Sequence, residues 1–142
     1  MTVAAILANK GSEVATIEAD AALSAAVAEL ARRKIGALVV TDGGEVVGIV
    51  SERDLVGCLA SRGAGALDRP VSEAMTAPAV TIDPNTPILT ALALMTQRRF
   101  RHLPIVQGGQ LAGLVSIGDL VKHRIDAIES EAQAMRSYIQ SA

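Results

Sequence analysis

Hydrophobic and polar positions follow the same order twice along this chain. Each half begins with a short apolar stretch, after which apolar residues recur every three to four positions and predict an amphipathic helix. Two further apolar runs follow, joined by a Gly-Gly pair, and the second runs directly into another helix start. The pattern therefore predicts strand, helix, strand, strand and helix, written twice. The strands are expected at residues 13–17, 37–40 and 45–50 in the first half, and at 78–82, 103–106 and 110–115 in the second.

The two halves form an internal repeat with an offset of 65 residues. The segment Thr16–Val56 aligns without a gap against Thr81–Val121. The Gly-Gly pair in each copy is typical of a hairpin, because both turn positions then tolerate positive φ. Identical pairs include Thr16/Thr81, Ile17/Ile82, Arg33/Arg98, Leu38/Leu103, Gly48/Gly113, Ser51/Ser116 and Asp54/Asp119.

The repeat also predicts how the chain is divided. We expect a first unit at residues 1–62, a glycine-bearing linker at 63–70, a second unit at 71–124 and a C-terminal helix at 125–142. A chain of 142 residues is the usual size of one compact domain. Both units are therefore expected to form a single α+β module.

Composition excludes several classes of function. Phe100 and Tyr138 are the only aromatic residues, and the net charge is −2 with acids and bases interspersed, so nucleic acid is an unfavourable partner. No apolar run reaches the ~18 residues that span a membrane. The single cysteine, Cys58, allows no internal disulfide or multi-cysteine zinc site. We therefore expect a cytoplasmic protein without a bound metal, membrane anchor or nucleic acid.

The residues of the repeat resemble a cystathionine-β-synthase (CBS) domain pair, also called a Bateman module. The resemblance covers essentially the whole chain and rests on the order Thr-Ile, apolar helix, RHLPIV, Gly-Gly and GLVS-x-x-DL. The stretches GALVV, GIVSERDL, SIGDLVKHRI and AMRSYIQ are similar to stand-alone single-pair CBS proteins. The resemblance implies a βαββα fold for each repeat, a pseudo-twofold axis between the repeats, and two clefts.

The resemblance also implies a function. CBS clefts commonly bind adenosine-containing ligands such as AMP, ADP, ATP, NAD(H) or S-adenosylmethionine, and the family acts as sensors rather than catalysts. The sequence carries no P-loop, Gly-x-Ser-x-Gly or His-Glu-x-x-His motif, so an enzyme is not expected. A regulatory adenine-nucleotide sensor that docks on an unidentified protein is the leading hypothesis. A constitutive interaction scaffold and an S-adenosylmethionine sensor are the alternatives.

Two phrases, GIVSERDL and GLVSIGDL, place a serine three residues before an aspartate at a predicted helix start. One interpretation is a capping box, in which side-chain oxygens satisfy the free N–H groups of the helix. The other is a ligand site, in which the aspartate accepts hydrogen bonds from ribose hydroxyls and the helix N-terminus favours an anion. Repetition alone does not separate the two interpretations, and the resemblance favours a ligand for at least one copy.

The resemblance assigns candidate residues to each cleft. In the first cleft, aliphatic side chains would hold adenine, and a basic pair would meet phosphate. Its residues would be Ile49, Val50, Ser51, Arg53, Asp54, Val80, Thr81, Arg101 and His102. The second cleft departs from the basic pattern, because Gly36 and Ala37 replace the Arg-His pair. Its residues would be Ala15, Thr16, Gly36, Ala37, Val115, Ser116 and Asp119, with Lys10 as the one candidate for a phosphate.

The C-terminal segment carries a heptad-like apolar seam. Apolar residues step by four, three, four, three and four, which puts them on one face of a long helix. The seam is Val121, Ile125, Ile128, Ala132, Met135 and Ile139. Modules of the family form disc-like dimers through helices, so we expect a homodimer to which the seam contributes. The alternative is that this helix folds back onto its own domain.

Overall fold

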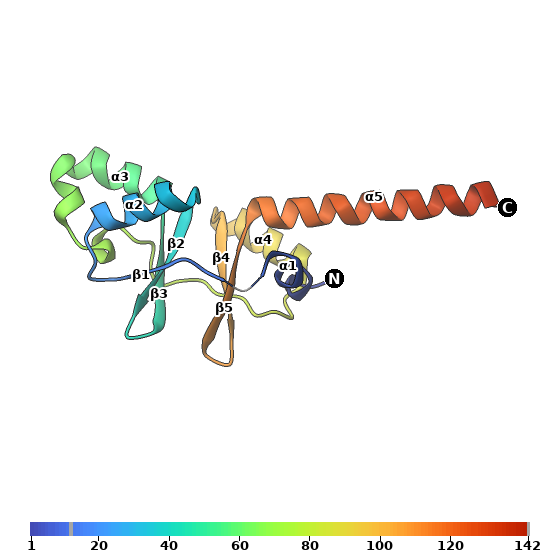
Figure 1. The fold of residues 1–142 in the computed structure, drawn as a ribbon, viewed down its shortest axis with the longest axis horizontal. Coiled ribbons are helices and arrows are strands. Elements are labelled where there is room, and N and C mark those ends of the chain that lie inside the picture. Colours follow the sequence, from blue (N-terminus) through green and yellow to red (C-terminus); the bar gives the residue numbers. More distant parts are fainter. Residues whose placement is uncertain (12, 142) are drawn as a thin grey trace.

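The computed structural model describes residues 1–11 and 13–141, which form two similar halves joined into one α+β module (Figure 1). The first half has a sheet in the order β1-β2-β3, and the second half has a two-stranded sheet, β4-β5. The strands are β1 (Thr16–Glu18), β2 (Ala37–Asp42), β3 (Glu45–Ser51), β4 (His102–Gln107) and β5 (Gln110–Ser116). The α-helices are α1 (Val3–Lys10), α2 (Leu23–Arg33), α3 (Glu52–Arg62), α4 (Ile88–Arg98) and α5 (Ile117–Ser141).

Each half contains the predicted hairpin. Strands β2 and β3 are antiparallel, as are β4 and β5, and both hairpins turn through Gly-Gly pairs with positive φ. Strand β1 lies parallel to β2, with Ile17 beside Val40. The expected α+β class with two tandem repeats is thereby confirmed.

The strand expected at residues 78–82 is wrong for most of its length. Only Ile82 pairs with the sheet, through an isolated parallel bridge to Ile105. In the first half, Val39 N–H donates to the Ala15 carbonyl and Ala19 N–H donates to that of Thr41. The repeat puts Pro104 and Pro84 at the two donor positions in the second half. Proline has no N–H, so neither hydrogen bond can form and the strand shrinks to one residue.

The segment that precedes each repeat packs against the other half of the molecule. Helix α1 precedes the first repeat, yet its Val3 and Ile6 are buried in the core of the second half. Between the repeats, the 3-10 helices η1 (Ala64–Asp68) and η2 (Val71–Glu73) bury Ala66 and Val71 in the core of the first half. The stretch expected as a linker, 63–70, therefore packs against the first half. In Figure 1 the chain crosses between the halves twice.

Two glycines let these exchanged segments approach the sheets. A Cβ on Gly48 would lie 2.7 Å from the carbonyl oxygen of Thr76 and 2.8 Å from the sulfur of Met75. Gly113, its repeat equivalent, meets the side chain of Leu7 in the same way. Leu7 and Met75 lie 68 positions apart rather than 65, so the first copy has three extra residues before β1.

Helix α5 is one continuous helix of 25 residues that leaves the body of the molecule (Figure 1). Its first turns contact α4, β5 and α1. The fold-back alternative is wrong, since Met135 and Ile139 are 62% and 66% exposed. Among the described residues, no helix is both long and apolar enough to cross a membrane.

We predict that Gly48→Ala lowers the free energy of unfolding by about 1–3 kcal/mol, because the new methyl group overlaps the Thr76 backbone. Gly57→Ala on α3 is the matched control, since nothing lies within 4 Å of its Cβ position. Replacing an open helical glycine should stabilise the fold by up to about 1 kcal/mol. Urea denaturation of both variants measures the difference. Equal changes in the two variants would contradict a tight contact at Gly48.

Candidate functional site

A cleft of about 1150 Å³ lies between the two halves. Its walls come from the ends of β3 and β5, the first turns of α3 and α5, the segment after η2, and the loop between α4 and β4. Side chains from both repeats therefore share one hollow. The lining residues are Gly36, Ile49, Ser51, Glu52, Arg53, Asp54, Gly57, Thr76, Pro78, Ala79, Val80, Arg98, Arg99, Phe100, Arg101, His102, Ser116 and Ile117.

Seven of the nine residues expected in the first cleft line this hollow: Ile49, Ser51, Arg53, Asp54, Val80, Arg101 and His102. The other two lie elsewhere. Val50 is fully buried in the core of the first half, because alternate residues of β3 face opposite sides of the sheet. Thr81 is exposed outside the cleft, as is its repeat equivalent Thr16 in β1.

The Ser51 and Asp54 side chains form a capping box at the start of α3. The Asp54 backbone N–H donates to Ser51 Oγ over 3.3 Å, and Ser51 N–H donates to Asp54 Oδ2 over 2.9 Å. The second carboxylate oxygen, Oδ1, accepts a hydrogen bond of 3.0 Å from the Thr76 hydroxyl. The cap thus uses one oxygen and directs the other toward Thr76 at the cleft wall.

Arginines dominate the charge of the cleft. Arg53, Arg98, Arg99 and Arg101 line it, against the carboxylates Glu52 and Asp54. Within the part of the chain that the structure describes, none of these arginines is in an ion pair. Sequence reasoning missed Arg98, Arg99 and the neighbouring Phe100, although RRF-RH is the most basic stretch of the chain.

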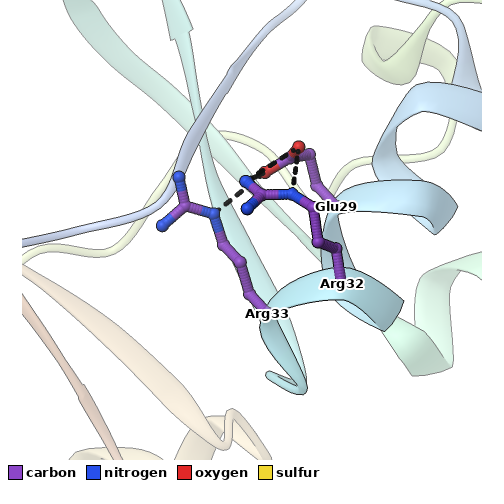
Figure 2. Close-up of polar contacts among 3 residues, drawn as sticks. All are labelled: Glu29, Arg32 and Arg33. Atoms are coloured by element: carbon purple, nitrogen blue, oxygen red, sulfur yellow. Dashed lines mark hydrogen bonds and ion pairs between the residues drawn. The ribbon is translucent and has the colours of Figure 1, made fainter.

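The first repeat neutralises the arginine that matches Arg98. On α2, Arg33 Nε donates to Glu29 over 2.9 Å, and Arg32 donates to the same carboxylate (Figure 2). Hydrogen bonds from Arg32 and then Arg33 lower the pKa of Glu29. In the second repeat, Leu94 stands where Glu29 stands in the first. Arg98 therefore has no carboxylate one helical turn away, and its charge is left to the cleft.

His102 is half-buried at the cleft wall. Its imidazole lies 3.6 Å from the position of a Cβ on Gly36, so the small residue of the first repeat makes room for the ring of the second. Burial and then the positive charge of Lys10 lower the pKa of His102. The ring is therefore neutral at pH 7, and one ring nitrogen can accept a hydrogen bond while the other donates.

Lys10 forms an ion pair with Asp119, the aspartate of the second repeat. Its ammonium group lies 2.7 Å from Asp119 Oδ2 and donates to the Leu114 carbonyl over 2.9 Å. Asp119 also accepts from the Ser116 N–H, as Asp54 does from Ser51. Burial raises the pKa of Asp119, but the hydrogen bonds from Lys10 and Ser116 outweigh it and hold the pKa below its ordinary value. Lys10 is thus the partner of Asp119 as Thr76 is of Asp54, although Lys10 bonds Oδ2, the capping oxygen, and Thr76 bonds Oδ1.

The residues expected in the second cleft are scattered. Gly36 and Ser116 line the first cleft, while Lys10 and Asp119 line a smaller hollow of about 400 Å³ beside α1 and α5. Val115 is fully buried in the second core, and Ala37 is buried in β2. Ala15 and Thr16 line neither hollow.

The family model for the CBS domain matches this chain twice, at residues 6–61 and 71–126. The chain belongs to the CBS-domain family. Each match covers one repeat together with part of the segment that precedes it and packs against the other half, and the fold is that of a CBS-domain pair.

Relatives agree with this assignment. The crystal structure of the CBS-domain containing protein ATU1752 from Agrobacterium tumefaciens is 44% identical, with a TM-score of 0.84, covering 87% of this chain and 99% of that one. The mitochondrial CBS domain-containing protein CBSX3 of Arabidopsis thaliana is 35% identical over 120 residues, 81% of this chain. The aligned segment spans only 58% of that plant protein.

Two more distant CBS structures contain ligands. CBSX2 was solved in complex with AMP, at 24% identity and a TM-score of 0.69, covering 80% of this chain and 89% of that one. The CBS pair of MJ0100 was solved with 5′-methylthioadenosine and S-adenosyl-L-methionine, at 21% identity and a TM-score of 0.79, covering 89% and 98%. At these identities they show the shared fold alone.

We predict that the fold loses stability when the pH falls below the ordinary histidine value of 6.5. The unfolded chain then takes up a proton that the folded chain, with its lowered His102 pKa, takes up only at lower pH. This loss of stability should be absent above pH 6.5, and it should disappear in His102→Gln. Urea denaturation from pH 7.5 to 5.5 tests this. NMR titration of His123→Gln, which leaves His102 as the only histidine, should give a midpoint below 6.5. A midpoint above it would contradict the prediction.

Proposed function

We propose that this CBS-domain pair is a regulatory module that binds an adenine nucleotide such as AMP in the cleft between its halves. Occupancy would alter how the module docks on a regulated protein. The observation that carries the proposal is a group of four arginines that have no ion pair within residues 1–11 and 13–141 and that line a cleft which also presents the Asp54 carboxylate.

The electrostatics of the cleft favour a phosphate. Several guanidinium groups converge on one hollow, and each can hold two phosphate oxygens at once. The matching positions of the first repeat are less basic, since Arg33 is paired with Glu29 and Gly36 stands where Arg101 stands, while Lys34 matches Arg99. Three of the four arginines come from the second repeat, and this asymmetry between two similar folds supports a ligand requirement rather than a requirement of the fold.

The remaining parts of a nucleotide have matching walls. Asp54 Oδ1 and the Thr76 hydroxyl are suited to exchange their mutual hydrogen bond for bonds to ribose hydroxyls. Ile49, Val80 and Phe100 supply apolar surface for the base. Because Asp54 already caps α3 through Oδ2, capping and ligand binding are compatible in one side chain.

The alternative functions differ in the charge of the ligand and in whether the cleft binds a ligand at all. S-adenosylmethionine carries a cationic sulfonium and an ammonium group, so four arginines disfavour it relative to a nucleotide. A constitutive scaffold would use Ser51 and Asp54 only as a cap and would bind no nucleotide. The cleft arginines, which have no ion pair among the residues that the structure describes, favour the sensor.

We further propose one ligand per chain. In the second repeat, Lys10 is ion-paired with Asp119, so a ribose would have to displace a charged partner instead of a hydroxyl. We also propose that the module acts as a cytoplasmic homodimer, with an interface near the usual ~1,600 Å². The apolar residues Val56, Leu59 and Leu89 are exposed on α3 and α4 and are available for it.

Titration calorimetry with AMP, ATP, NADH, S-adenosylmethionine and adenosine tests the sensor. We expect AMP or ATP to bind below the millimolar range with one site per chain. Arg101→Ala should weaken AMP binding by about tenfold, on the order of one charge-assisted hydrogen bond, and leave adenosine unchanged. Lys34→Ala, at the end of α2 and outside the cleft, is the control. Absence of binding by all five compounds would remove the basis of the proposal.

Asp54→Ala and Asp119→Ala form a matched pair, because each removes a helix cap at the same place in its repeat. Asp54→Ala should weaken AMP binding by about 1–3 kcal/mol, and Asp119→Ala should leave it unchanged. Loss of the cap should cost each variant about 1 kcal/mol of stability. Calorimetry and thermal denaturation give both quantities. If Asp54→Ala is destabilised but binds AMP as well as the unaltered chain, Asp54 serves as a cap alone.

A further inference from the structure

Helix α5 has two faces with different surroundings. Leu120 is fully buried, and His123 and Ala127 are partly buried against the body of the chain. Val121 and Ile125 are 42% and 49% exposed. At about 100° per residue the exposed face lies roughly 130° around the helix from the buried one. The seam residues therefore point away from their own module.

The seam continues beyond the body. After Ala127 every described residue of α5 is exposed, including Ile128, Met135 and Ile139. Figure 1 shows this part of the helix extending without neighbours. A 25-residue helix whose apolar stripe is left uncovered by the described residues of its own chain is a poor solitary helix, because most helical stability comes from packing an apolar face.

We propose that α5 pairs with α5 of a second copy as a parallel two-stranded coiled coil through the seam. This rests on the homodimer proposed above and specifies its geometry. The module body does not obstruct the pairing, because it lies against the other face of the helix.

Charges beside the seam favour the parallel direction. In a parallel pair, the residue immediately before Ile125 or Ala132 lies beside the residue five positions later in the second copy. Arg124 then faces Glu129, and Glu131 faces Arg136, so both kinds of contact are attractive and each occurs twice. In the described part of the chain none of these four residues has an ion pair of its own.

The antiparallel direction is less favourable. Antiparallel helices that overlap along the whole seam would bring Glu129 against Glu129 of the second copy, and Glu131 against Glu131. Antiparallel registers that pair opposite charges exist, but they use only four of the six seam residues. The parallel arrangement is the one that buries the whole seam and also pairs the charges.

Cysteine cross-linking in the full chain distinguishes these arrangements. In a Cys58→Ser background, Ile139→Cys should form disulfide-linked dimers under mild oxidation, because identical seam positions face each other in a parallel pair. Ser130→Cys, on the outer face, is the matched control and should not cross-link. An antiparallel pair would leave Ile139→Cys alone unlinked and would instead link it to a second variant, Val121→Cys if the whole seam overlaps or Ile128→Cys in a shifted register that pairs opposite charges, and either result would overturn the proposal.

Charge exchange gives an independent test. Glu131→Arg should raise the dimer dissociation constant about tenfold by placing like charges together, and adding Arg136→Glu should restore it. Sedimentation velocity measures both, with AMP titration of the same variants as the control for folding and ligand binding. If the chain is dimeric but insensitive to both changes and to Met135→Asp, the homodimer stands and the α5 pairing falls. A monomer at micromolar concentration in the unaltered chain would overturn the homodimer as well, while nucleotide binding would stand or fall on calorimetry alone.

Discussion

The close approach of each exchanged segment to the opposite sheet is the constraint on which this structure depends. The segment before each repeat completes the core of the other half, and it can do so only where β3 or β5 carries a glycine. Because Met75 contacts Gly48, Thr76 arrives beside Asp54. The corresponding contact of Leu7 with Gly113 brings Lys10 beside Asp119. The same packing therefore joins the halves and selects the chemical neighbour of Asp54 and of Asp119.

Two repeats with the same hairpin and helix arrangement carry different charge patterns. The caps at Ser51 and Ser116 form with similar geometry, and both α2 and α4 end at a residue with positive φ, Lys34 or Arg99. Around these shared features, the first repeat has exchanged Arg101 for Gly36 and has paired Arg33 with Glu29. The duplicated fold thus has similar packing in both repeats, while its cationic surface is concentrated on one side of the interface between the two halves.

Sequence patterns predict the repeat, the hairpins and the caps, because these follow from local periodicity and turn chemistry, whereas the cleft residues are predicted only through the resemblance to CBS-domain pairs. They do not predict the loss of the strand at 78–82, which requires knowing that Pro84 and Pro104 occupy the two donor positions of a parallel ladder. From the sequence, Lys10 is predicted only as a group that contacts a ligand. Its ion pair with Asp119 is not predicted, because the two residues are 109 positions apart. Arg98 could have been found by comparing its helical neighbours with those of Arg33.

The junction between cleft and helix has a mechanical consequence. Ser116 and Ile117 line the cleft, and α5 begins at the second of them and runs for 25 residues, about 37 Å at 1.5 Å per residue. A helix of this length is stiff and can pivot as a rigid rod at the cleft wall. By simple geometry a tilt of about 5° at this pivot displaces the far end of α5 by about 3 Å. An angular change too small to disturb the core is thereby magnified to the size of a side chain at the distant end.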